Sequence, residues 1–161
     1  MGINFRRIYI LAFSFIISSC SKGKLDVSSL TVTYSFKDGN FFERPFNKAL
    51  DCDYYYIFIL LNGDCSSCML ELPWWDSLLS NYNKLHPIFI VATDNAKLFS
   101  AYSKETILKK YNFTIDDNRS FYFINKLNES TVSIITDGEL NIIYKGDPIQ
   151  KRDFLRVYEK L

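Results

Sequence analysis

The chain has 161 residues, of which 48% are hydrophobic and 17% aromatic, and its formal net charge at pH 7 is +1. This apolar, aromatic-rich composition excludes a disordered chain and predicts a packed domain. The small net charge comes without a basic stripe or an acidic tail, which argues against a nucleic-acid partner.

The first nineteen residues are predicted to be an export signal. Arg6 and Arg7 precede residues 8–17, an apolar run that is too short for a membrane span of about 20 residues. Small residues then lead to Cys20, and this pattern resembles the lipobox of bacterial lipoproteins. The resemblance implies that Cys20 is the lipid-bearing first residue of the mature chain. The alternatives are an ordinary secretory signal and a twin-arginine signal, whose surrounding residues fit poorly. Ser21, by resemblance to the enterobacterial sorting rule, favours the outer membrane over the inner one and a periplasm-facing protein.

The remainder of the chain is predicted to be a short tether followed by one domain. Residues 20–29 are polar and are expected to be the lipidated tether. Residues 30–161 are long enough for a single domain with a real core. This domain starts with alternating apolar and polar residues, 30–36, and the turn pair Asp38-Gly39, which together predict a β-hairpin.

A buried strand and an amphipathic helix are predicted next. Residues 54–61 form a continuous apolar run, which is typical of a strand buried on both faces. Beyond it, apolar residues recur at every fourth position and predict one face of a helix that ends near residue 83: Leu70, Trp74, Leu78 and Tyr82.

A second strand and helix repeat this pattern. Residues 86–93 contain another buried apolar run, and Asp94 or Asn95 can cap a helix running to about residue 111. Alternation of strands and helices predicts parallel pairing with right-handed crossovers.

The last third predicts a hairpin and a terminal helix. Residues 131–136 and 140–144 are short strands joined by the turn signal Asp137-Gly138. A final helix is expected to present one apolar face, made of Phe154, Leu155, Tyr158 and Leu161. Residues 112–130 give a weaker pattern, interpreted as a short strand at 121–124 within an irregular connection.

The most informative motif is Cys65-Ser66-Ser67-Cys68, at the junction of the first buried strand and the helix. An ordinary thiol has a pKa near 8.5, and the free N–H groups of a helix N-terminus favour its thiolate. The spacing therefore predicts Cys65 as the exposed attacking sulfur. Cys68, one turn further on, is expected to be more buried and to resolve a mixed disulfide.

The order of elements and the residues around this motif resemble the thioredoxin-like superfamily. The segment from Cys68 to Pro73 is similar to the Cys-x-x-Glu-x-Pro segment of its TlpA/ResA branch, which acts in the cell envelope. The resemblance implies an α/β fold with a central mixed β-sheet flanked by helices, here with an N-terminal β-hairpin extension. It also implies thiol–disulfide exchange with envelope proteins, electrons supplied by another dithiol protein, and no dissociable cofactor or metal. Glu71 is implied to tune the ionisation of the cysteines, unless it is simply a solvated helix residue.

Two residues depart from the family pattern. Asp64 replaces the tryptophan usually found before the first cysteine, and its carboxylate would oppose a thiolate on Cys65 if the charge lies close. Ser130 takes the position of the family's cis-proline, and a cis bond without proline costs about 2.5–4 kcal/mol. These departures leave open a non-catalytic, lipid-tethered binding module.

Other uses of the cysteines are weaker. A structural disulfide across two residues closes a very short loop and restrains the unfolded chain little. Zinc needs four ligands, and only Cys52 and the lone His86 remain. Cys52 lies about eight extended residues, roughly 25 Å, before the motif, and is expected to be a free, partly buried thiol. His86 is expected to be a packing or surface residue. A peroxiredoxin would need threonine and proline before the attacking cysteine, and neither is present.

Overall fold

The computed structural model describes residues 23–103, 106–116, 118–128, 132–148 and 152–161. Seven strands of this described part form one mixed sheet in the order β2-β1-β5-β4-β3-β6-β7. The strands are β1 (Val32–Lys37), β2 (Asn40–Pro45), β3 (Tyr55–Asn62), β4 (Leu85–Ala92), β5 (Asn112–Asp116), β6 (Ser133–Thr136) and β7 (Ile142–Gly146). The helices are α1 (Ser66–Met69), α2 (Leu72–Leu79), α3 (Ala96–Ser103), α4 (Ser120–Ile124) and α5 (Arg152–Tyr158), with 3-10 turns η1 (Phe46–Lys48) and η2 (Ile107–Lys110).

Strand β3 lies in the interior of the sheet, as its continuous apolar sequence predicts. It pairs in parallel with β4 and antiparallel with β6, and six of its eight residues are buried. Strand β4 also pairs in parallel with β5. The predicted hairpins are both present, because β1 pairs antiparallel with β2 and β6 pairs antiparallel with β7.

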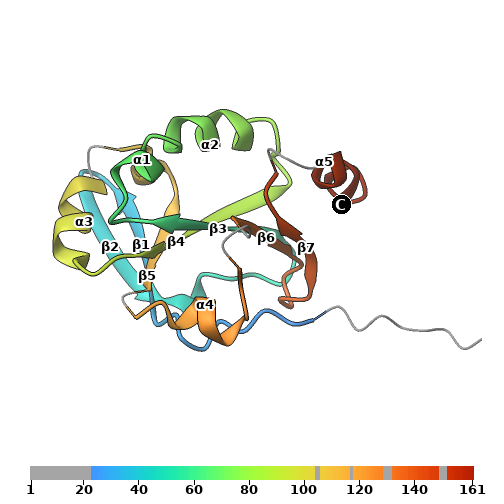
Figure 1. Cartoon of the computed structure of the whole chain (residues 1–161), viewed down its shortest axis with the longest axis horizontal. Helices are drawn as coiled ribbons and strands as arrows, with labels where there is room; N and C mark the ends of the chain where they lie inside the picture. The colour runs from blue at the N-terminus through green and yellow to red at the C-terminus, as the bar shows by residue number, and fades with distance from the viewer. Residues whose placement is uncertain (1–22, 104–105, 117, 129–131, 149–151) are drawn as a thin grey trace, which may run out of the picture.

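Two hydrophobic clusters cover the two faces of the sheet. Alternate residues of β3 point to opposite faces, so that Ile57 and Phe58 belong to different clusters. The first cluster lies under α2, α3 and α5 and contains Trp75, Phe99 and Phe154. The second lies under α4 and the segment that precedes β1. Figure 1 shows α1 and α2 on one side of the sheet and α4 on the other.

The helix after the cysteines differs from the prediction. Two helices, α1 and α2, replace one continuous helix, because Pro73 has no N–H to continue the hydrogen-bond ladder and lies at the start of α2. The buried face is also different: Leu70 is 80% exposed. The buried residues of the two helices are Met69, Leu72, Trp75 and Leu79. The residues that recur at every fourth position therefore lie on a neighbouring face of these helices. Besides the exposed Leu70, that face carries Trp74, Leu78 and Tyr82, which are only partly buried.

Among the described residues between 106 and 128, the structure differs from the prediction. The predicted helix to about residue 111 is replaced by α3, which spans Ala96–Ser103, and by the separate 3-10 turn η2. Strand β5, which follows η2, was not predicted. The segment expected to be a strand at 121–124 is helix α4. Phe121 is fully buried while Phe123 is 77% exposed, and a strand would place both residues on one face. The aromatic residues raised the strand propensity, but this burial pattern has no twofold period.

The terminal segments also refine the prediction. In α5 Phe154 is buried, whereas Leu155, expected on the same face, is exposed. Residues 23–29, part of the predicted tether, pack along the domain: Leu25 is buried and its N–H donates to the Leu140 carbonyl at 2.8 Å. The predicted signal and Cys20 lie outside the described residues. Within the described residues, no helix combines the length and apolar character needed to cross a membrane.

Candidate active site

The cysteine pair lies where β3 passes into α1, at the carboxyl end of the parallel strands. Cys65 directly precedes the helix and Cys68 lies within it, and the two sulfurs form a disulfide. Their Cα atoms are 5.2 Å apart. Both residues are half-buried, so the predicted contrast between an exposed Cys65 and a more buried Cys68 is absent in this disulfide state.

The sulfur of Cys65 lies within hydrogen-bonding distance of two polar groups. The backbone N–H of Cys68 donates to Cys65 Sγ at 3.3 Å. The hydroxyl of Ser67 lies 3.1 Å from the same sulfur. Donors of this kind stabilise a negative charge on sulfur, since hydrogen bonds to the charged form favour that form. The first turn of α1 can therefore stabilise a thiolate on Cys65 when the disulfide is opened.

Asp64 links the cysteine loop to the loop after β4. Its carboxylate accepts hydrogen bonds from the Thr93 hydroxyl at 2.6 Å and from the Asp94 N–H at 2.9 Å. These two bonds, the Thr93 bond first, lower the pKa of the Asp64 carboxyl. Asp64, which stands where the resemblance leads one to expect tryptophan, is thus a charged group held by the neighbouring loop. Thr93 was not singled out from the sequence, although it directly follows the strand adjacent to β3.

Gly63 allows a close approach between the cysteine loop and the core. A Cβ atom at this position would lie 2.8 Å from Val91 Cγ1 and 2.9 Å from the ring of Phe99. Both distances are too short for a carbon–carbon contact. A residue without a side chain is therefore needed between β3 and Asp64, where the chain turns toward α1.

Glu71 and Ser130 are the other predicted supporting residues, and only Glu71 belongs to the part of the chain that the structure describes. Glu71 is exposed at the junction of α1 and α2, and its side chain makes no capping hydrogen bond to α2. Its backbone continues the helical path, because its N–H donates to the Cys68 carbonyl at 3.2 Å. Ser130 lies outside the described residues.

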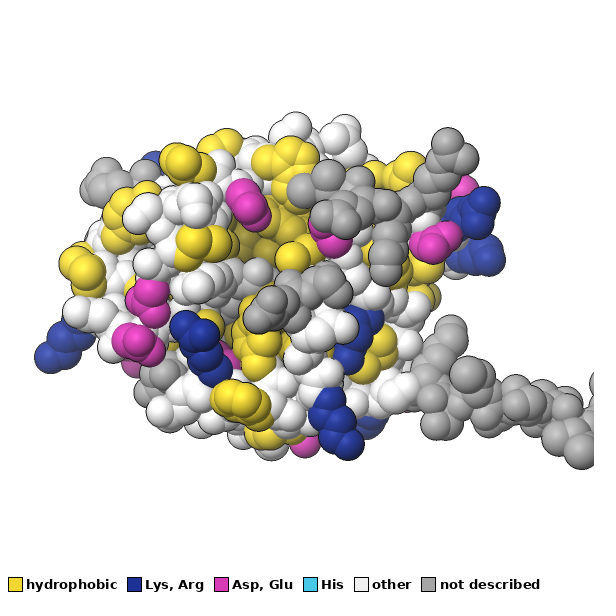
Figure 2. Space-filling view, viewed as in Figure 1, with side chains coloured by type: hydrophobic (Ala, Val, Ile, Leu, Met, Phe, Trp, Pro, Cys, Tyr) yellow, Lys and Arg dark blue, Asp and Glu magenta, His cyan; other side chains and the backbone are white. Residues whose placement is uncertain are grey.

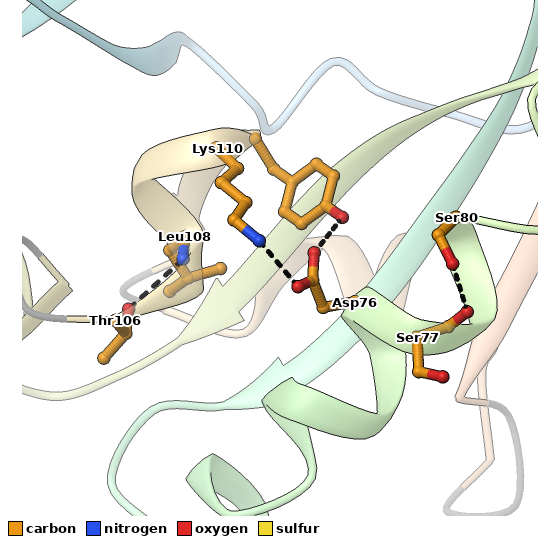
Figure 3. Close-up of polar contacts among 7 residues, drawn as sticks. Asp76, Ser77, Ser80, Thr106, Leu108 and Lys110 are labelled. Atoms are coloured by element: carbon orange, nitrogen blue, oxygen red, sulfur yellow. Dashed lines mark hydrogen bonds and ion pairs between the residues drawn. The ribbon is translucent and has the colours of Figure 1, made fainter.

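Helix α2, which follows the cysteine pair, is fixed to the body of the domain by Asp76. Lys110 Nζ donates to one carboxylate oxygen at 2.7 Å, and the Tyr111 hydroxyl donates to the other at 2.6 Å (Figure 3). The Lys110 bond, followed by the Tyr111 bond, lowers the pKa of Asp76. Burial, followed by this bond to Asp76, raises the pKa of Tyr111. Helix α2 is thereby held against η2 and against Tyr111, the residue that precedes β5.

The remaining cysteine and the histidine lie at the other end of β3. Cys52 is a free thiol, as predicted, but it is exposed rather than partly buried. His86 is exposed, with its ring centroid 4.1 Å from that of Tyr54, which agrees with a packing or surface residue. Cys52, Asp51 and Asp53 could each direct a ligand atom to a common point, but all three are exposed side chains.

Comparisons with known proteins identify the fold. No protein-family model matches the chain, and no curated protein matches it. Solved structures do. The thioredoxin domain of a thiol-disulfide oxidoreductase from Bacteroides vulgatus aligns with a TM-score of 0.58 at 16% identity, covering 89% of this chain and 98% of that one. The exposed lipoprotein thioredoxin Etrx1 from Streptococcus pneumoniae aligns with a TM-score of 0.56 at 13% identity, covering 80% and 98%. MTB DsbF aligns with a TM-score of 0.57 at 11% identity, covering 82% of this chain and 96% of that one. The chain therefore has the thioredoxin-like fold, with an N-terminal hairpin and a Cys-x-x-Cys pair.

Proposed function

We propose that the protein carries out thiol–disulfide exchange with other proteins through Cys65 and Cys68. The observation that supports this most directly is the disulfide itself, formed at the first turn of a helix that follows a central strand. A bridge across two residues restrains an unfolded chain little, so its position is better explained by chemistry than by stability. The solved structures of similar fold include proteins named as thiol-disulfide oxidoreductases.

The exchange proceeds by two balanced displacements. A partner thiolate attacks Cys65 Sγ and forms a mixed disulfide, while the Cys65–Cys68 bond breaks and Cys68 leaves as a thiolate. A second partner thiolate then attacks the partner sulfur of the mixed disulfide and releases the Cys65 thiolate. Two electrons pass from the partner to the cysteine pair. The reverse sequence reduces a partner disulfide, and Cys68 then resolves the mixed disulfide on Cys65.

The surrounding residues are assigned supporting parts in this proposal. The Cys68 N–H and the Ser67 hydroxyl stabilise the Cys65 thiolate, and the Asp64 charge limits that stabilisation. Glu71 is proposed to assist proton transfer at the pair, and Ser130 to border the partner's site in place of the usual proline.

The cellular setting is part of the same proposal. Cys20 is proposed to carry the lipid anchor after removal of residues 1–19, which would place the domain on the periplasmic side of the envelope, at the outer membrane. Its partners would be envelope proteins with cysteines, and an upstream dithiol protein would supply electrons. In an oxidising compartment disulfides form and persist, so the Cys65–Cys68 pair can alternate between its dithiol and disulfide states there.

The test is a redox titration with partner trapping. The protein is equilibrated in glutathione and dithiothreitol buffers, and the fraction of Cys65–Cys68 disulfide is measured. The Cys68→Ser variant is expected to retain a mixed disulfide on Cys65 with its natural partner, whereas Cys65→Ser should retain none. A pair that titrates far below the compartment's potential and traps no partner would instead support the non-catalytic binding module, which the absence of proline between Pro87 and Pro148 favours.

A further inference from the structure

A polar pocket of 280 Å³ lies at the opposite end of the sheet from the cysteines. It lies where β3, β4 and β5 begin, and its lining includes Tyr54, His86 and Asn112 from these three places. Arg44 of β2 and Lys110 of η2 also line it. The volume is just below the usual range of ligand sites, about 300–1,000 Å³, so a molecule that fills the pocket is small.

Arg44 brings an unpaired positive charge to this pocket. Its side chain is half-buried, and it forms no ion pair with an Asp or Glu of the described residues. Its Nε atom is buried without a hydrogen-bond partner there. Thr33, opposite Arg44 in the pairing of β1 with β2, does not accept from it, because the Thr33 hydroxyl also lacks a partner. Charged groups removed from water are normally paired, so this guanidinium calls for an anion.

Lys110 and His86 add further donors around the same pocket. Lys110 Nζ donates to Asp76 at 2.7 Å (Figure 3), and this bond uses one of the three donors of an ammonium group. His86 is exposed, and its ring is held 4.1 Å from the ring of Tyr54, centroid to centroid. On the face shown in Figure 2, by contrast, Lys and Arg side chains are spread out, several of them beside Asp or Glu. The pocket instead gathers its cationic and imidazole groups around one hollow.

Asp51, the acidic residue of the described lining, does not cancel this charge. It is exposed, and its carboxylate accepts the N–H of Asp53 at 3.1 Å. The Asp51 N–H donates to the hydroxyl of Tyr56 in the pocket wall. Burial raises the pKa of that hydroxyl and the Arg44 charge opposes the rise, so the guanidinium lies within electrostatic reach of this wall. Two cations, Arg44 and Lys110, therefore face one carboxylate, and the balance favours an anionic ligand.

We propose that this pocket binds the phosphate group of a small molecule. The guanidinium of Arg44 offers paired N–H donors that match phosphate oxygens, and Lys110 supplies a point charge. A phosphate group carries about 1.5 to 2 negative charges at neutral pH, which two cations match better than they match the single charge of a carboxylate. The site does not depend on the exchange reaction, because it lies at the opposite end of β3 from Cys65.

Calorimetric titration of the full-length protein with inorganic phosphate tests the site. Sodium chloride holds the ionic strength constant, so that screening does not change during the titration. Binding of one phosphate per chain is expected. His86, the protein's only histidine, gives an independent signal. Its imidazole resonances in the proton NMR spectrum should shift when phosphate is added and stay in place when chloride is added at the same ionic strength.

Two arginine variants locate the binding. Arg44→Gln should weaken phosphate binding by about tenfold or more, because charge-assisted hydrogen bonds are lost. Arg156→Gln is the matched control, since it removes the same charge from α5, where Arg156 and its partner Asp153 are well exposed. This control should bind phosphate like the wild type. If Arg44→Gln fails to fold, His86→Ala changes an exposed side chain instead and should weaken binding about threefold.

A comparison of ligands identifies the chemistry. Acetate should bind about tenfold more weakly than phosphate, and equally tight binding of acetate would overturn the phosphate assignment. Glycerol 3-phosphate separates the two sources of a phosphate group. Tighter binding than that of inorganic phosphate would support a phosphate monoester, and equal or weaker binding would support free phosphate.

Two results would overturn the proposal as a whole. The first is the absence of binding heat together with unshifted His86 resonances. The second is an equal loss of affinity in Arg44→Gln and Arg156→Gln, which would mean that phosphate responds only to the overall charge of the protein. Neither result would bear on the exchange reaction at Cys65.

Discussion

The two ends of β3 carry the same kind of side chain in opposite surroundings. After the strand, Cys65 Sγ accepts a hydrogen bond from the Cys68 N–H at 3.3 Å. Before the strand, Cys52 is exposed between Asp51 and Asp53, with its Sγ 3.8 Å from a carboxylate oxygen of Asp53. Hydrogen-bond donors stabilise a thiolate on the sulfur that accepts from them. The two cysteines therefore differ in the groups around their sulfurs as well as in exposure, and the proposed exchange at Cys65 depends on this difference.

The largest expected effect is a difference in exchange rate between variants at the two ends of β3. Cys65→Ser removes the attacking sulfur and should lower the rate of exchange with a model protein disulfide by about 10³-fold or more. Cys52→Ser is the matched control and should retain the wild-type rate. If Cys52→Ser lowered the exchange rate as much as Cys65→Ser, the contrast between the two ends of β3 would be wrong.

The next effect concerns stability at the Cys52 end. A Cβ atom on Gly138 would overlap the backbone of Cys52, so Gly138→Ala should destabilise the fold by about 2–3 kcal/mol. Gly23→Ala is the control, because the nearest atom to its new Cβ is Ile142 Cδ1 at 4.0 Å. Urea unfolding measures both changes. Equal midpoints for the two variants would show that the turn between β6 and β7 moves aside without cost.

Competition for an alkylating reagent compares the two thiols directly. In the reduced protein at pH 7, Cys65 should react with iodoacetamide about tenfold faster than Cys52, because the thiolate is the reacting form. Mass spectrometry of the digested protein measures both rates in one sample. Faster labelling of Cys52, although it is the more exposed thiol, would reverse the comparison.

A smaller effect is expected where α2 is fixed to the domain. Asp76→Asn should cost about 1 kcal/mol at pH 7, since its partners Lys110 and Tyr111 lie partly at the surface. The lowered pKa of Asp76 means that this stabilisation is present above about pH 4, the usual range of a carboxyl group, and is lost as the pH falls through the lower folded value.

The pH dependence of urea unfolding checks this sign. The difference between wild type and Asp76→Asn should be constant near neutrality and shrink below about pH 4. Asp153→Asn is the control, because Asp153 pairs with Arg156 at 3.5 Å with both side chains well exposed. A difference that grows on acidification would contradict the assignment.

The smallest effect isolates the charge beside Cys65. Asp64→Asn should raise the alkylation rate of Cys65 at pH 7 by about threefold, because one negative charge near the thiolate is removed. The rate at Cys52 should not change. A slower reaction at Cys65 would mean that the hydrogen bonds to Thr93 and Asp94 matter more to the loop than the charge does.

The parts of the fold that the sequence predicts well are those with a local physical signal. β3 and β4 follow from continuous apolar runs, and the two hairpins follow from Asp-Gly turns. The cysteine pair follows from its spacing after a strand. Helix α4 could not be told from a strand, because five residues rich in aromatics satisfy both patterns until the burial of Phe121 is known.

The contacts around the candidate site were hidden for a different reason. Asp64 and Thr93 are 29 residues apart, and no local pattern joins them. Parallel pairing of β3 with β4 places both residues just beyond adjacent strand ends, which is a signal that topology could have supplied. The exposure of Leu70 and Leu98 could not be predicted, because an exposed leucine on a helix has no sequence signature that distinguishes it from a buried one.

If Cys20 carries the proposed lipid, the packed segment before β1 limits the distance between the domain and the membrane. The Gly23 carbonyl already accepts a hydrogen bond from the Ile142 N–H at 2.9 Å. If Cys20 carries a lipid as proposed, only about 10 Å of extended chain separates the acyl group from this first fixed point. Leu25 belongs to the cluster under α4, on the opposite face of the sheet from α1 (Figure 1). So short a connection would hold that face close to the bilayer. The sulfurs of Cys65 and Cys68 would then face away from the membrane, toward proteins that diffuse past.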